Sequence, residues 1–229
     1  MEQAHGSWGL NIKNSKEFVE KREALYNKYR PIELDNTIEK TEKFKLMEKW
    51  YKETLDVLLE YKLKETDIYN TVASNKFILR TGTKEFLEKM HNSNIPVLML
   101  SAGVGNVIEN ILDYNNIYFD NIHLDSNFLI FKNGEAIGVN KKIIHTMNKN
   151  SADLIEKFGD VIKNRKNIIL FGDIVSDIDM VSAEDLKNTI TVGFLDVKKV
   201  ENLDFYNKAF DVVCTDQTSF LEVMKILNI

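Results

Sequence analysis

The stretch that most constrains this chain is Asn167–Asp177, with the sequence NIILFGDIVSD. Its four apolar residues follow one another without alternation, which is typical of a parallel strand covered on both faces. We expect Gly172 to allow a sharp turn where the strand ends. Asp173 and Asp177 would then lie at the carboxyl end of the strand, where open α/β sheets place their ligands. The alternative is a strand end whose carboxylates are solvated or cap the next helix.

Length, charge and cysteine content limit the classes of protein to which the chain can belong. Its 229 residues fit one domain of moderate size, or a core domain with a smaller insertion. A net charge of −5 gives no reason to expect nucleic acid or an anionic membrane as a partner. The single Cys214 excludes an internal disulfide and fits a reducing compartment. Without a membrane-spanning apolar stretch or a signal-peptide pattern, we expect a soluble, cytoplasmic protein, with a monomer as the default state.

Hydrophobic periodicity divides the chain into a helical first part and an alternating second part. The first part contains a helix ended by Pro31, a longer helix from about Ile38, and helices at Glu65–Ala73 and Thr83–Met90. The second part contains five apolar runs that predict strands, at Val97–Leu100, Asn121–Leu124, Ile168–Phe171, Thr189–Val192 and Val212–Cys214. Helical patterns separate most of these strands. We therefore predict an α/β fold whose parallel sheet carries helices on both faces.

The sequence makes a specific prediction for each of two turns in the second part. The pair Asn133-Gly134 favours a type I′ turn and predicts a β-hairpin. After the strand that ends at Leu100, we expect a turn containing Ser101 and Gly103. Ser101 would then place its hydroxyl at the head of a helix, where free N–H groups and the helix dipole favour an anion. An ordinary helix cap is the alternative role for this serine.

Three charged residues are candidates for phosphate or metal binding. Asp173 and Asp177 could hold a hard divalent cation through oxygen ligands, or could instead cap a helix and satisfy backbone donors. Lys149 precedes a helix expected near Ser151, where its ammonium could pair with a phosphate or could simply be solvated. The chain has no Gly-rich phosphate loop, HExxH motif or Cys–His metal spacing.

Together, these candidates resemble a known constellation. A serine after one strand, a lysine before a later helix and GDxxxD after another strand resemble motifs II, III and IV of the haloacid dehalogenase (HAD) phosphatases. More specifically, the chain resembles the cytosolic 5′-nucleotidase III family, also called pyrimidine 5′-nucleotidases. The segments that carry this resemblance are KYRPIELD (Lys28–Asp35), LMEKWYKET (Leu46–Thr54), NIPVLMLSAGVGNVIE (Asn94–Glu109), KKIIHTMNKN (Lys141–Asn150) and NIILFGDIVSDIDM (Asn167–Met180).

The resemblance implies a fold and an activity. The fold would be a HAD-like Rossmannoid parallel sheet, with a mainly helical cap at residues 1–80 and an α/β core at residues 81–229. The activity would be Mg²⁺-dependent hydrolysis of nucleoside 5′-monophosphates to nucleoside and phosphate. The substrates would be pyrimidine or 7-methylguanosine nucleotides, and the sequence does not fix the preference between them.

The resemblance also implies roles for residues in the core. Ser101 and the backbone of Ala102 would bind the substrate phosphate. Lys149 would neutralise the phosphate and the charge that develops in the transition state. Asp173 would ligate Mg²⁺, and Asp177 would support the metal site from the same turn.

In the cap, the resemblance implies contacts with the nucleotide. Glu33 matches the glutamate with which the family contacts the nucleobase, and Thr54 matches a small hydroxyl residue that contacts the nucleotide. Trp50 and Tyr51 are nearby aromatic residues that could stack on a base or pack between helices.

One motif of the family is absent from these 229 residues. The family's reaction runs through an aspartyl-phosphate, formed by the first Asp of a DxDxT motif, while the second Asp protonates the leaving oxygen. That motif ends the central strand of the HAD sheet, and we expect it to precede Met1. Without this strand, two inner strand edges would have no partner.

Two hypotheses from different classes follow. In the first, the native protein is a 5′-nucleotidase and this sequence is truncated at its N-terminus, so that the chain by itself is inactive. In the second, the chain is a non-catalytic relative that at most binds nucleotides. A HAD phosphatase acting on a phosphomonoester other than a nucleotide is a third reading, against which Glu33 and the cap segments argue.

Overall fold

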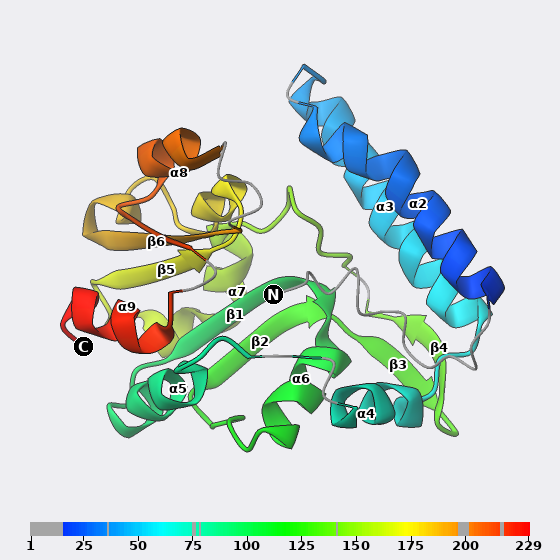
Figure 1. Ribbon diagram of the computed structural model, residues 1–229, viewed down its shortest axis with the longest axis horizontal. Coiled ribbons are helices and arrows are strands. Elements are labelled where there is room, and N and C mark those ends of the chain that lie inside the picture. Colours follow the sequence, from blue (N-terminus) through cyan, green and yellow to red (C-terminus); the bar gives the residue numbers. More distant parts are fainter. Residues whose placement is uncertain are drawn as a thin grey trace. The chain divides into compact units, whose positions relative to one another are not determined.

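Two long paired helices open the described part of the chain. A computed structural model describes residues 16–35, 37–74, 77, 79–140, 142–196, 202–215 and 218–229. Helix α2 covers Lys16–Leu34 and helix α3 covers Lys40–Glu60 (Figure 1). They pack through an aromatic cluster in which Trp50 stacks on Tyr29, with 5.9 Å between the ring centroids. Burial of this aromatic face stabilises the pair.

Pro31 lies inside α2, so the prediction that it ends this helix was wrong. Proline removes one backbone donor, but its fixed φ is compatible with helical geometry. The turn that follows Pro31 is closed by a hydrogen bond from the Asp35 N–H to the Pro31 carbonyl oxygen, at 3.0 Å. An ion pair between Arg30 and Glu33 spans the same turn. Local side-chain and backbone contacts therefore carry the helix past the proline.

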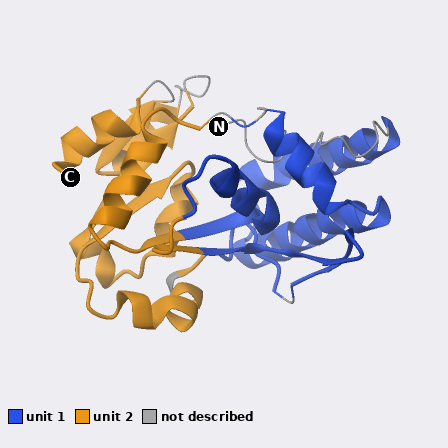
Figure 2. Cartoon of the chain, turned by 90° about the horizontal axis from the view of Figure 1, so that it is seen from below, with its two compact units in different colours: residues 1–78, 99–118, 124–148 blue, residues 79–98, 119–123, 149–229 orange. Residues whose placement is uncertain are grey.

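The chain forms two compact units. Unit 1 comprises residues 1–78, 99–118 and 124–148, and unit 2 comprises residues 79–98, 119–123 and 149–229 (Figure 2). Strands β1 (Val97–Val104) and β2 (Ile122–Asn127) pair with each other, and each has residues in both units. No helix among the described ranges is long and apolar enough to cross a membrane.

A three-stranded parallel sheet forms the centre of unit 2, as the alternating pattern predicted. It consists of β5 (Ile168–Gly172), β6 (Thr189–Leu195) and β7 (Val212–Thr215). One face packs against α5 (Thr83–Asn92) and α9 (Phe220–Leu227) (Figure 1). The rings of Phe86, Phe171 and Phe220 meet there. The other face packs against α8 (Leu203–Ala209) through Leu195, Tyr206 and Phe210. The remaining elements of unit 2 are α7 (Ser151–Ile162) and the 3-10 helices η1 (Val175–Met180) and η2 (Asp185–Asn188).

The cover over β5 is incomplete, which differs from the expectation that both faces are buried. Ile169 is 36% exposed, and its register partner Ile190 on β6 is 44% exposed. The aromatic side chains of α5 and α9 pack two residues further along, on Phe171. Among the described residues, β5 pairs only with β6 and β1 pairs only with β2. Both strands therefore present an edge that no described strand covers.

Unit 1 contains the predicted hairpin. Strands β3 (Leu129–Lys132) and β4 (Glu135–Val139) are antiparallel, and φ is 53° at Asn133 and 77° at Gly134. Positive φ at both central residues is what a type I′ turn requires, so this prediction is confirmed. The hairpin closes a core with α3, α4 (Glu65–Ala73) and α6 (Gly105–Tyr114), to which Leu58, Leu63 and Leu129 contribute.

Strand β1 continues through Ser101 to Val104, so the predicted turn at Ser101 and Gly103 was wrong. Helix α6 begins only at Gly105, and Ser101 consequently does not lie at the head of a helix. The end of the strand is held by side chains of β2. Ser126 Oγ donates a hydrogen bond to the Gly103 carbonyl oxygen at 2.9 Å, and Asn127 Nδ2 donates to the Ala102 carbonyl oxygen at 3.0 Å.

Gly105→Ala is expected to destabilise unit 1 by about 1–3 kcal/mol. A Cβ at this position would lie 2.5 Å from Cζ of Phe128, so the ring would have to move. Gly159→Ala in α7 is the matched control, because its nearest neighbour would be Ile155 Cγ2 at 3.8 Å. An alanine inside a helix is favoured over glycine by roughly 0.5–1 kcal/mol. Urea unfolding of both variants measures the difference, and equal stabilities would contradict the tight packing of Gly105.

Candidate functional site

The carboxyl end of β5 brings Asp173 and Asp177 together, as the sequence predicted. Gly172 ends the strand, but its φ lies outside the left-handed region, so a sharp turn is not the reason for glycine here. A Cβ on Gly172 would instead lie 2.6 Å from Cβ of Asp177. Glycine is needed because Asp177, at the start of η1, folds back over the end of the strand.

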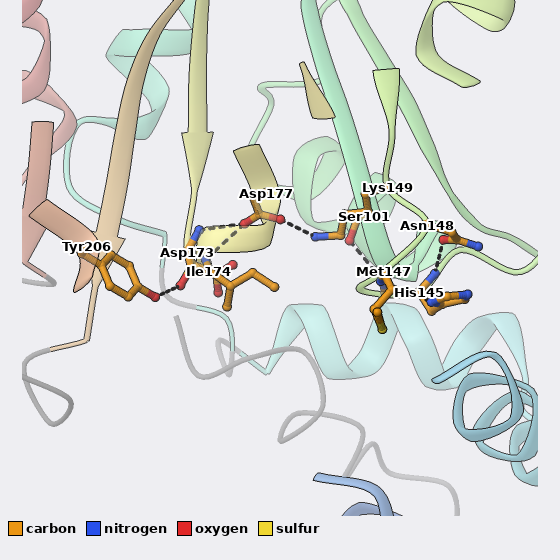
Figure 3. Close-up of polar contacts among 10 residues, drawn as sticks. Ser101, His145, Met147, Asn148, Lys149, Asp173, Ile174, Asp177 and Tyr206 are labelled. Atoms are coloured by element: carbon orange, nitrogen blue, oxygen red, sulfur yellow. Dashed lines mark hydrogen bonds and ion pairs between the residues drawn. The ribbon is translucent and has the colours of Figure 1, made fainter. Parts of the chain in front are cut away.

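The Asp177 carboxylate organises this turn and binds Lys149 (Figure 3). Its Oδ2 accepts hydrogen bonds from the backbone N–H groups of Asp173, at 3.0 Å, and Ile174, at 3.2 Å. Its Oδ1 accepts from Lys149 Nζ at 2.9 Å. The side chains of Lys149 and Asp177 are 12% and 4% exposed, so this ion pair is largely buried. The lysine ammonium is thereby held at a fixed position beside the end of β5.

Asp173 has its backbone fixed while its side chain is exposed. The Tyr206 hydroxyl donates a hydrogen bond to the Asp173 carbonyl oxygen at 2.6 Å (Figure 3). Desolvation by the surrounding protein raises the pKa of the Asp173 carboxyl, the Asp177 carboxylate adds to the rise, and the Lys149 ammonium opposes it. Because the side chain is exposed, its desolvation is partial. Repulsion from the Asp177 carboxylate is therefore the cause of the raised Asp173 pKa that the geometry supports most directly.

The residues at this end of β5 fit part of a Mg²⁺ site. Asp173 presents an exposed carboxylate, and a nearby cation would relieve its repulsion from Asp177. Both Asp177 oxygens are engaged by Lys149 and backbone amides, so Asp177 supports the turn in this structure. The described residues contain no cluster of three or more His, Cys, Asp or Glu residues that could hold a metal. Mg²⁺ usually binds one or two carboxylates together with waters and substrate phosphates, which is compatible with Asp173 as one ligand.

The predicted phosphate-binding residues Ser101 and Ala102 lie in unit 1, near the end of β1. The Gly103 N–H donates a hydrogen bond to Ser101 Oγ at 3.1 Å. Because the hydroxyl oxygen accepts this bond, the hydroxyl proton is left to donate to an anion. The geometry is that of a serine oriented by its own backbone, without the helix N-terminus that the sequence had suggested.

The predicted nucleotide contacts of the cap also lie in unit 1. Glu33 pairs with Arg30 on α2, and both side chains are mostly buried, at 12% and 18% exposure. Thr54 Oγ1 donates to the Trp50 carbonyl oxygen within α3, at 2.9 Å. Trp50 and Tyr51 are 4% and 5% exposed and pack in the helix–helix cluster, so packing is the role that the structure displays for both.

The candidate residues thus fall into two groups. Lys149, Asp173 and Asp177 are in contact within unit 2. The predicted phosphate and nucleotide contacts Glu33, Thr54, Ser101 and Ala102 belong to unit 1. Sequence reasoning missed Tyr206, because no periodic pattern links it to a strand end 33 positions earlier. It also missed Asn127, although a polar residue at the end of a short buried strand was a signal that could have been used.

Comparison with known proteins gives a consistent result. A sequence model of the family described as pyrimidine 5′-nucleotidase (UMPH-1) matches residues 3–229. A 7-methylguanosine phosphate-specific 5′-nucleotidase of Drosophila melanogaster is 33% identical over 202 residues, which are 87% of this chain and 63% of the fly protein. The chain therefore spans just under two thirds of the length of this relative.

Solved structures agree on the fold. Cytosolic 5′-nucleotidase IIIB bound to cytidine superposes with a TM-score of 0.86 and 29% identity, covering 100% of this chain and 78% of that protein. A HAD family hydrolase of Salmonella enterica superposes with a TM-score of 0.59 at 12% identity, covering 97% of this chain and 65% of the other, which supports the fold alone. The predicted HAD-like α/β fold class is confirmed.

Proposed function

The chain belongs to the pyrimidine 5′-nucleotidase (UMPH-1) family, and from this premise we propose that the protein is a Mg²⁺-dependent nucleoside 5′-monophosphate hydrolase. The observation that carries the proposal is the buried Lys149–Asp177 ion pair directly beside the exposed Asp173 at the end of β5. A fixed cation next to an exposed carboxylate suits a phosphate monoester and its metal ion.

Each site residue has a proposed task. Ser101 and the backbone of Ala102 bind the phosphate by hydrogen bonds, and Lys149 neutralises its charge. Asp173 holds Mg²⁺, while Asp177 fixes the turn and the lysine. When bound, Mg²⁺ would polarise a phosphoryl oxygen and neutralise developing charge. Mg²⁺ dependence and these assignments rest on the family resemblance together with the contacts of Lys149 and Asp177.

The nucleophile is proposed to come from a DxDxT segment, which the 229 residues do not contain. We expect this chain alone to bind nucleotide without turnover. A non-catalytic nucleotide-binding protein is the second candidate function. Both functions require nucleotide binding, and only the first gains hydrolysis when a DxDxT segment is supplied. Phosphate release with and without such a segment therefore separates the two.

CMP, UMP and 7-methyl-GMP are the proposed substrates, because the family is named for pyrimidine 5′-nucleotidases and the fly relative for 7-methylguanosine phosphate. We expect a monomer in the cytoplasm. The net charge of −5 supports a small molecule, rather than nucleic acid or a membrane, as the partner. The single cysteine supports a reducing compartment.

Glu33→Ala is expected to weaken binding of nucleotides by roughly tenfold, while binding of phenyl phosphate changes little. The reason is that a carboxylate in the cap would contact the nucleobase, which phenyl phosphate lacks. Calorimetry of the chain with CMP, 7-methyl-GMP and phenyl phosphate measures this. Glu48→Ala, at an exposed position on α3, is the control. An equal loss for all three ligands would contradict a role of Glu33 in base recognition.

A further inference from the structure

A single asparagine joins two segments of unit 1 that the proposed function uses. Asn127, the last residue of β2, is 1% exposed. Its Nδ2 donates to the carbonyl oxygens of Ala102, at 3.0 Å, and Ile144, at 2.8 Å. Its Oδ1 accepts from the Ile144 N–H at 2.8 Å. One side-chain amide therefore satisfies three backbone groups on two separate segments, which few other side chains could do.

The hydrogen bond from Asn127 to the Ala102 carbonyl also orients the Ser101 hydroxyl, because a single peptide plane connects the two. The Ala102 carbonyl and the Gly103 N–H belong to the same planar peptide group, so fixing one fixes the other. The Gly103 N–H donates to Ser101 Oγ at 3.1 Å. Asn127 consequently sets the direction from which Ser101 Oγ accepts a hydrogen bond, and with it the direction in which the hydroxyl proton is available.

The contact with Ile144 anchors the segment that precedes Lys149 in the chain. Within this segment, the His145 N–H donates to Asn148 Oδ1 at 2.7 Å (Figure 3). Asn148 Nδ2 in turn donates to the Ile143 carbonyl oxygen at 2.8 Å. The Met147 N–H donates to His145 Nδ1 at 3.3 Å. Burial lowers the pKa of His145 to about 4, so its ring is neutral and can accept this bond near neutral pH.

We propose that Asn127 is a positioning residue for phosphate recognition. It aligns the Ser101–Gly103 segment and ties it to the segment 143–148, which leads into Lys149. Asn127 itself does not touch the substrate. This inference rests on the proposed function, because it assigns to Ser101 and Ala102 the role of phosphate ligands.

Calorimetry of the full 229-residue chain in Mg²⁺ tests the inference with CMP, inorganic phosphate and cytidine as probes. Asn127→Asp keeps the size and the acceptor but removes both N–H donors, and Asn127→Ala removes the amide. We expect affinity for CMP and phosphate to fall on the order of tenfold in both variants, with cytidine affinity unchanged. Asn140→Ala is the control, because Asn140 Nδ2 donates to the Ser126 carbonyl oxygen and its Oδ1 accepts from the Phe128 N–H, and neither bond is made to β1.

The outcomes distinguish this inference from the function on which it rests. Unchanged CMP affinity in the Asn127 variants, or an equal loss for cytidine, overturns the positioning role. A wild-type chain that binds none of the three probes overturns the proposed function as well. NMR of the wild type covers the case in which the variants do not fold. Inorganic phosphate should shift the NMR signals of the Gly103 amide and the Asn127 side-chain amide together. A shift of the Gly103 signal alone contradicts the proposed coupling between Asn127 and the Ser101–Gly103 segment.

Discussion

Asp177→Asn is expected to lower the free energy of unfolding of unit 2 by about 3 kcal/mol, because it leaves the Lys149 ammonium without its partner in a largely buried position. The asparagine amide would also bring N–H donors toward Lys149, or toward the backbone N–H groups of Asp173 and Ile174, which donate to Oδ2 of Asp177 in the wild type. In either orientation at least one donor faces another donor.

Asp179→Asn is the matched control for this substitution. Asp179 lies in the same 3-10 helix, but it is exposed, and the change there is expected to stay within about 0.5 kcal/mol. Lys149→Met and the double variant complete a thermodynamic cycle. Because the two side chains are in direct contact at 2.9 Å, we expect a coupling of roughly 1–3 kcal/mol. Additive effects in urea unfolding would contradict the buried ion pair.

The elements with strong local signals were predicted well from the sequence. The strand at Ile168–Gly172, the parallel sheet around it and the Asn133-Gly134 hairpin depend on periodicity and turn chemistry within a few residues. The same local logic failed at Pro31, where the Arg30–Glu33 ion pair and the hydrogen bond from the Asp35 N–H accompany one further helical turn.

The features that sequence reasoning did not predict depend on contacts between distant residues. Strand β1 runs past Ser101 because Ser126 and Asn127, more than twenty positions away, bind its carbonyl groups. Lys149 and Asp177 were assigned separate roles, although they form one ion pair across 28 positions. Neither periodicity nor spacing encodes such contacts, and only the folded chain reveals which polar groups satisfy one another.

The largest effect on activity is expected from supplying the nucleophile. A serine, a lysine and an aspartate can bind a phosphate and its metal ion, but the proposed chemistry requires an aspartate that attacks phosphorus and a second that protonates the leaving oxygen. Removing such a covalent step removes most of the rate enhancement, which for phosphate-ester hydrolysis amounts to many powers of ten. We therefore expect a change from no measurable turnover to turnover, with nucleotide affinity largely unchanged.

The most direct test measures phosphate release from CMP, UMP and 7-methyl-GMP, with Mg²⁺ and with EDTA, by two proteins. One is the 229-residue chain, and the other is the same chain preceded by a segment that carries the family's DxDxT motif. We expect no release by the first protein and Mg²⁺-dependent release by the second, and this release should be lost when the first Asp of that motif is changed to Asn. Mg²⁺-dependent release by the 229-residue chain alone would contradict this expectation.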